Sequence, residues 1–203
     1  IYISTSTGVL RSDDYGENWS IIDSTYVKYR DDWRGIALSK SGEIVYIIND
    51  NTTSGNDDYV SYDYGMTWNV LSDITGKKYS ICISHNGKYI CSPIADAGSS
   101  GGIWCSTDYG NTWSKKNSLA NFTDCAMSSS GQFTLLISIN GTPKIWLSND
   151  YLNSFSSVKT LTNEDTDVNT GCAMSSSGKY MVTGSKNNIY VSSDYGKNWN
   201  SKM

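Results

Sequence analysis

One eight-residue pattern recurs along the chain and limits its fold more than any other feature. The pattern is Ser-x-Asp-Tyr-Gly-x-x-Trp, here called the box, and it has four regular copies and one degenerate copy: Ser12–Trp19, Ser61–Trp68, Ser106–Trp113, Ser192–Trp199 and Ser148–Phe155. Successive copies begin 49, 45, 42 and 44 residues apart. A period of about 40–50 residues is typical of the four-stranded blade of a β-propeller. The repeats therefore predict an all-β chain with one antiparallel blade for each box.

Short apolar segments around each box also align from copy to copy. An inner-strand segment alternates large residues with Ala or Cys, as in Ile36–Ser39 and Cys172–Ser175, and a turn with Gly and a second apolar strand follow it. Because neighbouring blades should cover both faces of this inner strand, we expect it to be fully buried. A third strand precedes the box and a fourth begins at the box Trp. We expect a single propeller domain, residues 1–203, with blades at about 1–23, 33–72, 79–117, 123–159 and 170–203.

The first copy has no inner strand before it. Residues 1–4 resemble a second strand and Val9–Arg11 a third, while only four residues follow Trp199 at the other end. Propellers usually close by completing one blade with strands from both ends. Two alternatives follow: the first blade lacks its inner strand, or the chain is part of a longer propeller with further blades. We favour the second.

The residue types of the box suit a tight turn between two strands. The Ser hydroxyl and Asp carboxylate can hydrogen-bond the turn backbone, the Gly can take a positive φ, and the Trp can pack between sheets. We therefore expect a structural role for the box residues and largely buried, equivalent positions for the five aromatic ones. These residues are Ser12, Asp14, Gly16, Trp19, Ser61, Asp63, Gly65, Trp68, Ser106, Asp108, Gly110, Trp113, Ser148, Asp150, Phe155, Ser192, Asp194, Gly196 and Trp199.

With these motifs the sequence resembles the Asp-box, or BNR, repeat β-propellers, a superfamily that includes sialidases, sortilin-type receptors and photosystem assembly factors. The resemblance covers nearly the whole chain and implies the fold, but it says little about function. The sequence of the last repeat, Cys172–Tyr180 followed by Ile189–Trp199, is also similar to repeat proteins of large DNA viruses and of microbes. Leu152 replaces the box Gly and Phe155 the box Trp in the fourth copy, so that turn should be the least regular.

The sialidase resemblance implies a test for catalysis that the sequence does not meet. Sialidases hold the substrate carboxylate with three Arg from different blades and use a Tyr with a Glu partner as nucleophile. Here all three Arg precede residue 35, none is followed by Ile-Pro, and there are only three Glu. The single His85 lies in a predicted hairpin turn, which disfavours Ser-His or multi-His chemistry. We expect a protein that is not an enzyme and that uses no cofactor and no metal.

Charge and hydropathy argue against a nucleic-acid partner and against a membrane-spanning helix. The 16 basic and 20 acidic residues give a net charge of -4, and no basic run provides the clustered charge that nucleic acid requires. The longest apolar runs, such as Ile44–Ile48, fall far short of the roughly 20 residues of a membrane-spanning helix. We therefore predict neither a nucleic-acid partner nor a membrane-spanning segment.

The five Cys align with columns of apolar residues and are expected to be buried as small hydrophobes. Cys82 and Cys91 lie symmetrically about the Asn86-Gly87 turn, so they should be cross-strand partners. A disulfide between them and a pair of free thiols both remain open.

Specificity should reside in the loops, since loop lengths vary between copies while the strands do not. The segments that join one blade to the next, and those between second and third strands, should meet on the face opposite the boxes. Candidate contact residues there are Tyr29, Arg30, Trp33, Arg34, Asp58 and Asp96. Trp33 could equally cover the start of the inner strand. The box Tyr residues form a second, repeated surface on the rim.

We interpret the chain as a non-catalytic interaction or structural propeller. It would recognise a protein or glycan partner or form part of a larger assembly, and an extracellular or virion surface is favoured over other locations. The alternative is a glycan-directed protein, either a lectin or a divergent glycosidase.

Overall fold

The computed structural model describes residues 1–5, 8–22, 27, 33–49, 58–95, 101–118, 121–139, 142–161, 171–185 and 187–202. These residues form nineteen strands and no helix. The strands make five separate antiparallel sheets, the first with three strands and the others with four. The predicted all-β architecture with one sheet for each box is therefore confirmed.

Each sheet is one blade, and its strands follow one another in sequence order. Blade 1 comprises β1 (Tyr2–Thr5), β2 (Gly8–Arg11) and β3 (Ser20–Ile21); blade 2 comprises β4 (Trp33–Leu38), β5 (Val45–Asn49), β6 (Asp58–Ser61) and β7 (Asn69–Leu71). Blade 3 comprises β8 (Cys82–Ile83), β9 (Ile90–Ile94), β10 (Gly102–Ser106) and β11 (Ser114–Asn117). Blade 4 comprises β12 (Phe122–Met127), β13 (Thr134–Ser138), β14 (Lys144–Ser148) and β15 (Ser156–Thr160); blade 5 comprises β16 (Cys172–Met174), β17 (Met181–Gly184), β18 (Ile189–Ser192) and β19 (Asn200–Lys202).

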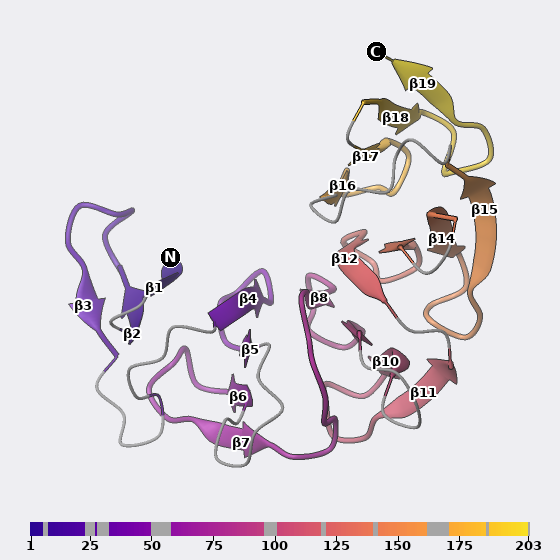
Figure 1. Ribbon diagram of the computed structural model, residues 1–203. Coiled ribbons are helices and arrows are strands. Elements are labelled where there is room, and N and C mark those ends of the chain that lie inside the picture. Colours follow the sequence, from indigo (N-terminus) through magenta and orange to yellow (C-terminus); the bar gives the residue numbers. More distant parts are fainter. Residues whose placement is uncertain are drawn as a thin grey trace.

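The five blades follow one another along an open arc (Figure 1). The inner strands β4, β8, β12 and β16 lie on the concave side, and β3, β7, β11, β15 and β19 lie on the outside. Blades 1 and 5 stand at opposite ends of the arc and do not meet. In the described residues blade 1 has no strand inside β1, as the sequence indicated.

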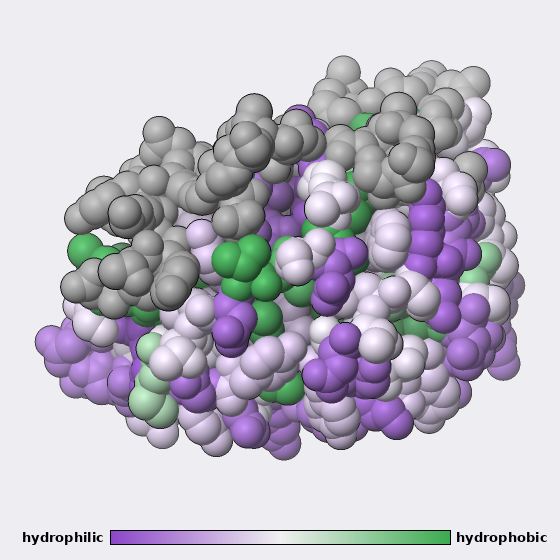
Figure 2. Space-filling view, turned by 90° about the horizontal axis from the view of Figure 1, so that it is seen from below, coloured by the Kyte–Doolittle hydropathy of each residue, from purple (hydrophilic) through white to green (hydrophobic). Residues whose placement is uncertain are grey.

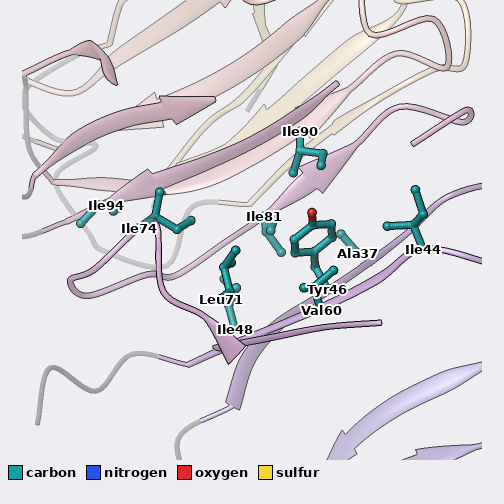
Figure 3. Packing of buried hydrophobic residues seen from close by; sticks show 10 residues of the cluster. All are labelled: Ala37, Ile44, Tyr46, Ile48, Val60, Leu71, Ile74, Ile81, Ile90 and Ile94. Atoms are coloured by element: carbon teal, nitrogen blue, oxygen red, sulfur yellow. The ribbon is translucent and has the colours of Figure 1, made fainter. Parts of the chain in front are cut away.

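Hydrophobic side chains fill each of the four gaps between consecutive blades. In the gap between blades 2 and 3, Tyr46, Ile48 and Val60 of blade 2 pack with Ile81 and Ile90 of blade 3 (Figure 3). We call the face of a blade that meets the following blade its forward face. Tyr46, Ile48 and Val60 thus define the forward face of blade 2.

The opposite face of each blade, its rear face, meets the preceding blade. The rear face of blade 2 consists of Val45, Ile47, Tyr59 and Trp68, which form one cluster with Val9 of blade 1. Since side chains alternate along a strand, every second residue of β5 belongs to each face. All five residues of β5 are buried.

In blades 2, 3 and 4 the second strand is buried along its whole length and the inner strand is not, which differs from the expectation for the inner strand. β5, β9 and β13 are buried along their whole length, whereas only Ala37 of β4 is buried. The inner strand has a paired neighbour on one edge only and lines the concave side of the arc, so part of its surface stays open. The second strand lies between two others and between two blades.

Hydrogen bonds between turns also link blade to blade. The turns between first and second strands donate in series, from Lys40 N–H to His85 O at 2.8 Å, from His85 N–H to Ser129 O at 2.9 Å and from Ser129 N–H to Ser176 O at 2.8 Å. Gly87 takes a φ of +79° in this turn and lies against Ile44 of the preceding blade. A Cβ there would meet the terminal Cδ1 of Ile44 at 2.6 Å, and the positive φ favours Gly at this position.

The five box aromatic residues are not equally buried, in contrast to the expectation. Trp68 is 5% exposed, and Trp113, Phe155 and Trp199 are partly buried against the preceding blade. Trp19 is 37% exposed. Among the described residues no blade lies in front of blade 1, so Trp19 lacks the surface that buries its counterparts.

On the coloured part of the face seen in Figure 2, hydrophilic residues predominate and hydrophobic residues show in separate groups. No helix within the described ranges is long and apolar enough to cross a membrane.

Candidate functional site

The box carboxylates are engaged within their own turns. In blade 3, Asp108 Oδ1 accepts hydrogen bonds from the Ser106 hydroxyl at 2.8 Å and the Thr112 N–H at 2.9 Å, and Oδ2 accepts the Thr112 hydroxyl at 2.7 Å. The Ser106 hydroxyl also accepts the Gly110 N–H at 2.9 Å. Two of these hydrogen bonds recur in the other four boxes. In each, the Asp Oδ1 accepts the Ser hydroxyl and the backbone N–H of the residue four positions after the Asp.

These bonds stabilise the ionised form of each carboxyl group. Hydrogen bonds from Asn18 and Ser12 lower the pKa of Asp14 to about 2, and bonds from Asn198 and Ser192 lower that of Asp194 to about 2. The pKa values of the other three box carboxyls also lie below their usual range. General acid catalysis by a carboxyl needs the opposite shift.

The residue before the box Gly is a Tyr in a left-handed conformation in every blade. The φ angles lie between +60° and +66°, a region that costs a non-Gly residue about 1–2 kcal/mol. The ring of Tyr151 lies 5.3 Å from Tyr89 and that of Tyr195 lies 5.3 Å from Phe133, in each case on the preceding blade. The box Tyr residues are 39–97% exposed, so they form an aromatic rim.

A crevice of about 670 Å³ opens on this rim between blades 4 and 5. Phe133 and Tyr195, with rings inclined at 31°, provide aromatic surface, and Gln132, Asn149 and Lys197 provide polar groups. Leu147, Val158, Ser177 and Gly196 complete the described lining. The crevice is a candidate binding site.

The residue at the second box position differs between the gaps. In blade 2 this position is Tyr62, whose hydroxyl reaches across to Tyr109 O of blade 3 at 3.3 Å. In blade 4 the same position is the shorter Asn149, which lines the crevice. A smaller crevice of about 300 Å³ lies between blades 1 and 2, where the position is Asp13. The variable residue in Ser-x-Asp was a sequence signal for this site that the loop-based expectation did not use.

The predicted loop residues are not brought together in the described structure. Trp33 lies in the cluster between blades 1 and 2, with its ring 6.1 Å from that of Tyr59, and Arg34 beside it on β4 is exposed. Tyr29, Arg30 and Asp96 lie outside the described residues.

Asp58, predicted as a contact residue, is buried within the blade 2 to blade 3 gap. Its Oδ2 lies 2.6 Å from Lys78 Nζ and its Oδ1 accepts the Asn49 N–H at 2.9 Å. Both side chains of the ion pair are 4% exposed. Other blades have Val9, Ile103 or Ile145 in this column, so Asp58 is one half of a buried pair that joins two blades and not a surface contact.

Four of the five cysteines are buried side by side in and near the gap between blades 3 and 4. Cys82 and Cys91 are cross-strand partners, as predicted, and Cys105 Sγ donates to Cys91 Sγ at 3.4 Å. All five thiols are free. Burial raises the pKa of Cys91 and of Cys125, which fits neutral thiols that pack as small hydrophobes.

No cluster of three or more His, Cys, Asp or Glu side chains in the described ranges is placed to hold a metal ion. The isolated His85 is exposed, and its Nε2 lies 3.0 Å from the Ser129 hydroxyl of the next blade. Its contacts are those of a turn residue that links two blades.

Comparison with known proteins agrees with this architecture. A model of the BNR-Asp box repeat matches residues 189–202, which span β18, the fifth box and β19. No curated protein matches the chain in sequence.

Solved structures with similar folds are multi-blade proteins of low sequence identity. The chain is similar to a GH74 xyloglucanase from Xanthomonas campestris, with a TM-score of 0.68 and 13% identity over 97% of this chain and 35% of that one. It is similar to an ancestral GH74 enzyme, with a TM-score of 0.70 and 15% identity over 99% and 29% of the two chains. It is also similar to YCF48 bound to a D1 peptide, with a TM-score of 0.65 and 15% identity over 98% and 63%.

The chain thus spans about a third of the length of the GH74 proteins and less than two thirds of YCF48. At these identities the likeness concerns the fold. The repeat-model match shows a BNR-Asp box repeat in the fifth blade, and the five boxes at equivalent turns and the shared architecture show a propeller-type fold of antiparallel blades.

Proposed function

We propose that this chain is a non-catalytic propeller that recognises a protein or glycan partner and works within a larger assembly. The observation that carries the proposal is the chemistry of the crevice between blades 4 and 5. Its described lining offers an aromatic pair, two side-chain amides, a hydroxyl and one Lys, but no carboxylate. Glycoside hydrolysis needs two carboxyl groups across the scissile bond, whereas stacking and hydrogen bonding are sufficient for binding.

A glycan is the second candidate class of ligand, and the same lining favours it. The rings of Phe133 and Tyr195 could stack on the apolar face of a sugar, and Gln132 and Asn149 could bond its hydroxyl groups. The similar solved propellers support both classes, because one is a xyloglucanase and another was solved with a bound peptide.

Binding to arrays of glycans and peptides, followed by a turnover assay on each hit, tests this proposal. For a ligand held in the crevice, Tyr195→Ala and Asn149→Ala should each weaken binding about tenfold, or about 1.4 kcal/mol. Tyr151→Ala is the matched control, since Tyr151 has the same left-handed φ in the adjacent box and does not line the crevice.

Three results would contradict the proposal. Turnover of a bound glycan would show that the protein is an enzyme. An equal loss of binding affinity in Tyr195→Ala and Tyr151→Ala would show that the ligand does not bind in the crevice. Absence of any binder on both arrays would leave no recognition function at this surface.

A further inference from the structure

The backbone N–H groups that line the crevice between blades 4 and 5 are already hydrogen-bonded within their own blades. Those of Phe133, Tyr195 and Gly196 donate to hydroxyl or carbonyl oxygens at 3.0–3.1 Å. Those of Gln132 and Lys197 do so at 3.2 Å and 3.4 Å. A receptor that binds a peptide main chain, for example by adding a strand to a sheet edge, uses free backbone groups. These five donors are not free, so the lining does not favour a peptide main chain.

The polar side chains that line the crevice are, in contrast, largely unpaired. Among the described residues, the amides of Gln132 and Asn149 and the hydroxyl of Tyr195 make no hydrogen bond. Each of these groups can both donate and accept, which is the chemistry that pairs with a sugar hydroxyl. The crevice therefore recognises a ligand through side chains, and its free groups suit a glycan better than a peptide.

The aromatic surface of the crevice is held in place by the neighbouring blade. The Tyr195 ring lies 5.3 Å from the Phe133 ring, and a Cβ at Gly178 would lie only 2.5 Å from that Phe133 ring. Tyr195 remains 39% exposed. An aromatic ring that is already fixed loses little conformational freedom when a ligand stacks on it. The apolar face of a pyranose ring is a suitable partner for the exposed part of Tyr195.

Lys197 gives this crevice a positive charge that the same position lacks in the other boxes. The residue after the box Gly, or after Leu152 in blade 4, is Lys only in blade 5. Its counterparts in blades 1 to 4 are Glu17, Met66, Asn111 and Asn153. The charge is therefore a property of this one gap and not of the repeated turn.

The carboxylates of blades 4 and 5 leave that charge uncompensated. In the described part of these blades they are Asp124, Asp150 and Asp194, and each accepts hydrogen bonds at both oxygens from hydroxyl or N–H groups. None of the three lines the crevice, and Lys197 forms no ion pair among the described residues. An anionic group on a ligand would meet an unpaired cation here.

From these groups we infer that the crevice binds an acidic glycan, through a sugar unit that carries a carboxylate on its ring, as in a uronic acid. The inference rests on the proposed recognition function and narrows its ligand to one class. The apolar face of the sugar would stack on Tyr195, ring hydroxyls would bond Asn149 and Gln132, and the carboxylate would pair with Lys197. A carboxylate at the edge of a pyranose ring leaves the apolar face free to stack.

Two oligosaccharides that differ only in charge test the inference. An oligomer of galacturonic acid and the same oligomer with methyl-esterified carboxyl groups would be titrated into the protein by calorimetry at pH 7 and low ionic strength. The parent should bind the acid about tenfold more tightly than the ester, because only the acid makes a charge-assisted bond to Lys197. Added salt should weaken binding of the acid more than binding of the ester.

A matched pair of Lys variants assigns the effect to the crevice. Lys197→Met removes the charge and keeps a side chain of similar length, so it should bind the acid about tenfold more weakly than the parent and the ester with unchanged affinity. Lys202→Met is the control, because Lys202 is also exposed in blade 5 and does not line the crevice. It should bind both oligosaccharides like the parent. Cooperative thermal unfolding of each variant shows that the fold is intact.

Other results would overturn the inference. Equal affinity of the parent for acid and ester, or an equal loss of affinity for the acid in the two Lys variants, would show that Lys197 does not select the ligand. A neutral glycan or a peptide that binds in preference to the acid, and that Tyr195→Ala weakens, would refute the acidic ligand and leave the proposed recognition function intact. Absence of any glycan or peptide binding would remove both.

Discussion

The boxes of blade 1 and blade 3 have the same turn and different surroundings. In both, the Ser hydroxyl donates to the Asp carboxylate at 2.8 Å and accepts the Gly N–H, at 2.8 Å from Gly16 and 2.9 Å from Gly110. Yet Trp19 is exposed, while Trp113 packs in the gap beside Tyr46 with an edge-to-face ring contact at 6.2 Å.

The difference shows that the box has two separable parts. Its turn is local and forms wherever the eight residues occur, because every bond in it joins residues at most four positions apart. Burial of its aromatic residue depends on the blade before it. The following predictions test this separation, beginning with the largest expected effect.

Replacing the aromatic residue should have very different costs at the two positions. Trp113→Ala should lower the free energy of unfolding by about 3–5 kcal/mol, because it removes a large side chain from a packed gap. Trp19→Ala should cost less than about 1 kcal/mol, as expected for an exposed position. Urea unfolding of both variants measures the two values.

Equal losses of unfolding free energy in the two variants would contradict the difference in burial between Trp19 and Trp113. If Trp19→Ala cost as much as Trp113→Ala, the exposed face of blade 1 would have to be covered in solution. Repeating the measurement at low protein concentration would then separate burial by a second copy, which is lost on dilution, from burial within the chain.

The degenerate box of blade 4 gives a second example in which the packing of a box residue depends on the preceding blade. Gly110 lies against the large Tyr46, and a Cβ at that position would meet the Tyr hydroxyl. In blade 4 the same position is Leu152, which is fully buried in one cluster with the small Cys91, the counterpart of Tyr46. The larger Leu152 of blade 4 is thus packed beside the smaller Cys91 of blade 3, whereas Gly110 of blade 3 is packed beside the larger Tyr46 of blade 2.

This pairing predicts that Leu152 is needed for packing in spite of its left-handed φ of +67°. Leu152→Ala should lower the free energy of unfolding by about 2–4 kcal/mol, because a cavity forms beside Cys91. Val70→Ala, at an exposed strand position, is the control. A loss below about 1 kcal/mol for Leu152→Ala would show that the gap closes without it.

The sequence specified the repeats, the sheet order and the incomplete first blade, because each depends on short-range patterns. It could not specify burial across the gaps. Trp19 and Trp113 have the same local sequence, and only the presence of a preceding blade separates them.

The candidate site was harder to predict for the same reason. Asp58 looks like a loop carboxylate until Lys78, twenty residues later, is placed against it by packing of blades 2 and 3. The crevice is lined by Asn149 and Tyr195, which come from different repeats. Contacts between repeats depend on the register of whole blades, which no single motif encodes.

The box Asp should contribute the same pH dependence of stability in blade 1 and in blade 3, because its hydrogen bonds all lie within the turn. The unfolded Asp pKa is about 3.9, and the folded pKa of Asp14 is about 2. A lowered folded pKa contributes stability that is present above the unfolded value and is lost as pH falls from about 4 to about 2. Asp14→Asn and Asp108→Asn should each reduce the pH dependence of the urea midpoint in this window by a similar amount. A change confined to Asp108→Asn would tie the carboxylate to the gap and not to the turn.

The smallest effect concerns a single indole N–H. In blade 2 the buried Trp68 donates Nε1–H to Gly65 O at 3.1 Å, whereas the buried Nε1 of Trp113 has no hydrogen-bond partner among the described residues. A buried donor without a partner costs about 1–3 kcal/mol, so Trp113→Phe removes a penalty while it loses some apolar contact. Its free energy of unfolding should stay within about 1 kcal/mol of the parent value.

Trp68→Phe loses a satisfied hydrogen bond together with apolar contact and should therefore be the less stable variant, by about 1 kcal/mol. The natural Phe155 at this position in blade 4 indicates that a Phe ring fits the gap. If Trp113→Phe proves as costly as Trp68→Phe, the Trp113 indole makes a polar contact in solution, and the aromatic residue of blade 3 would be held by its turn as well as by the blade before it.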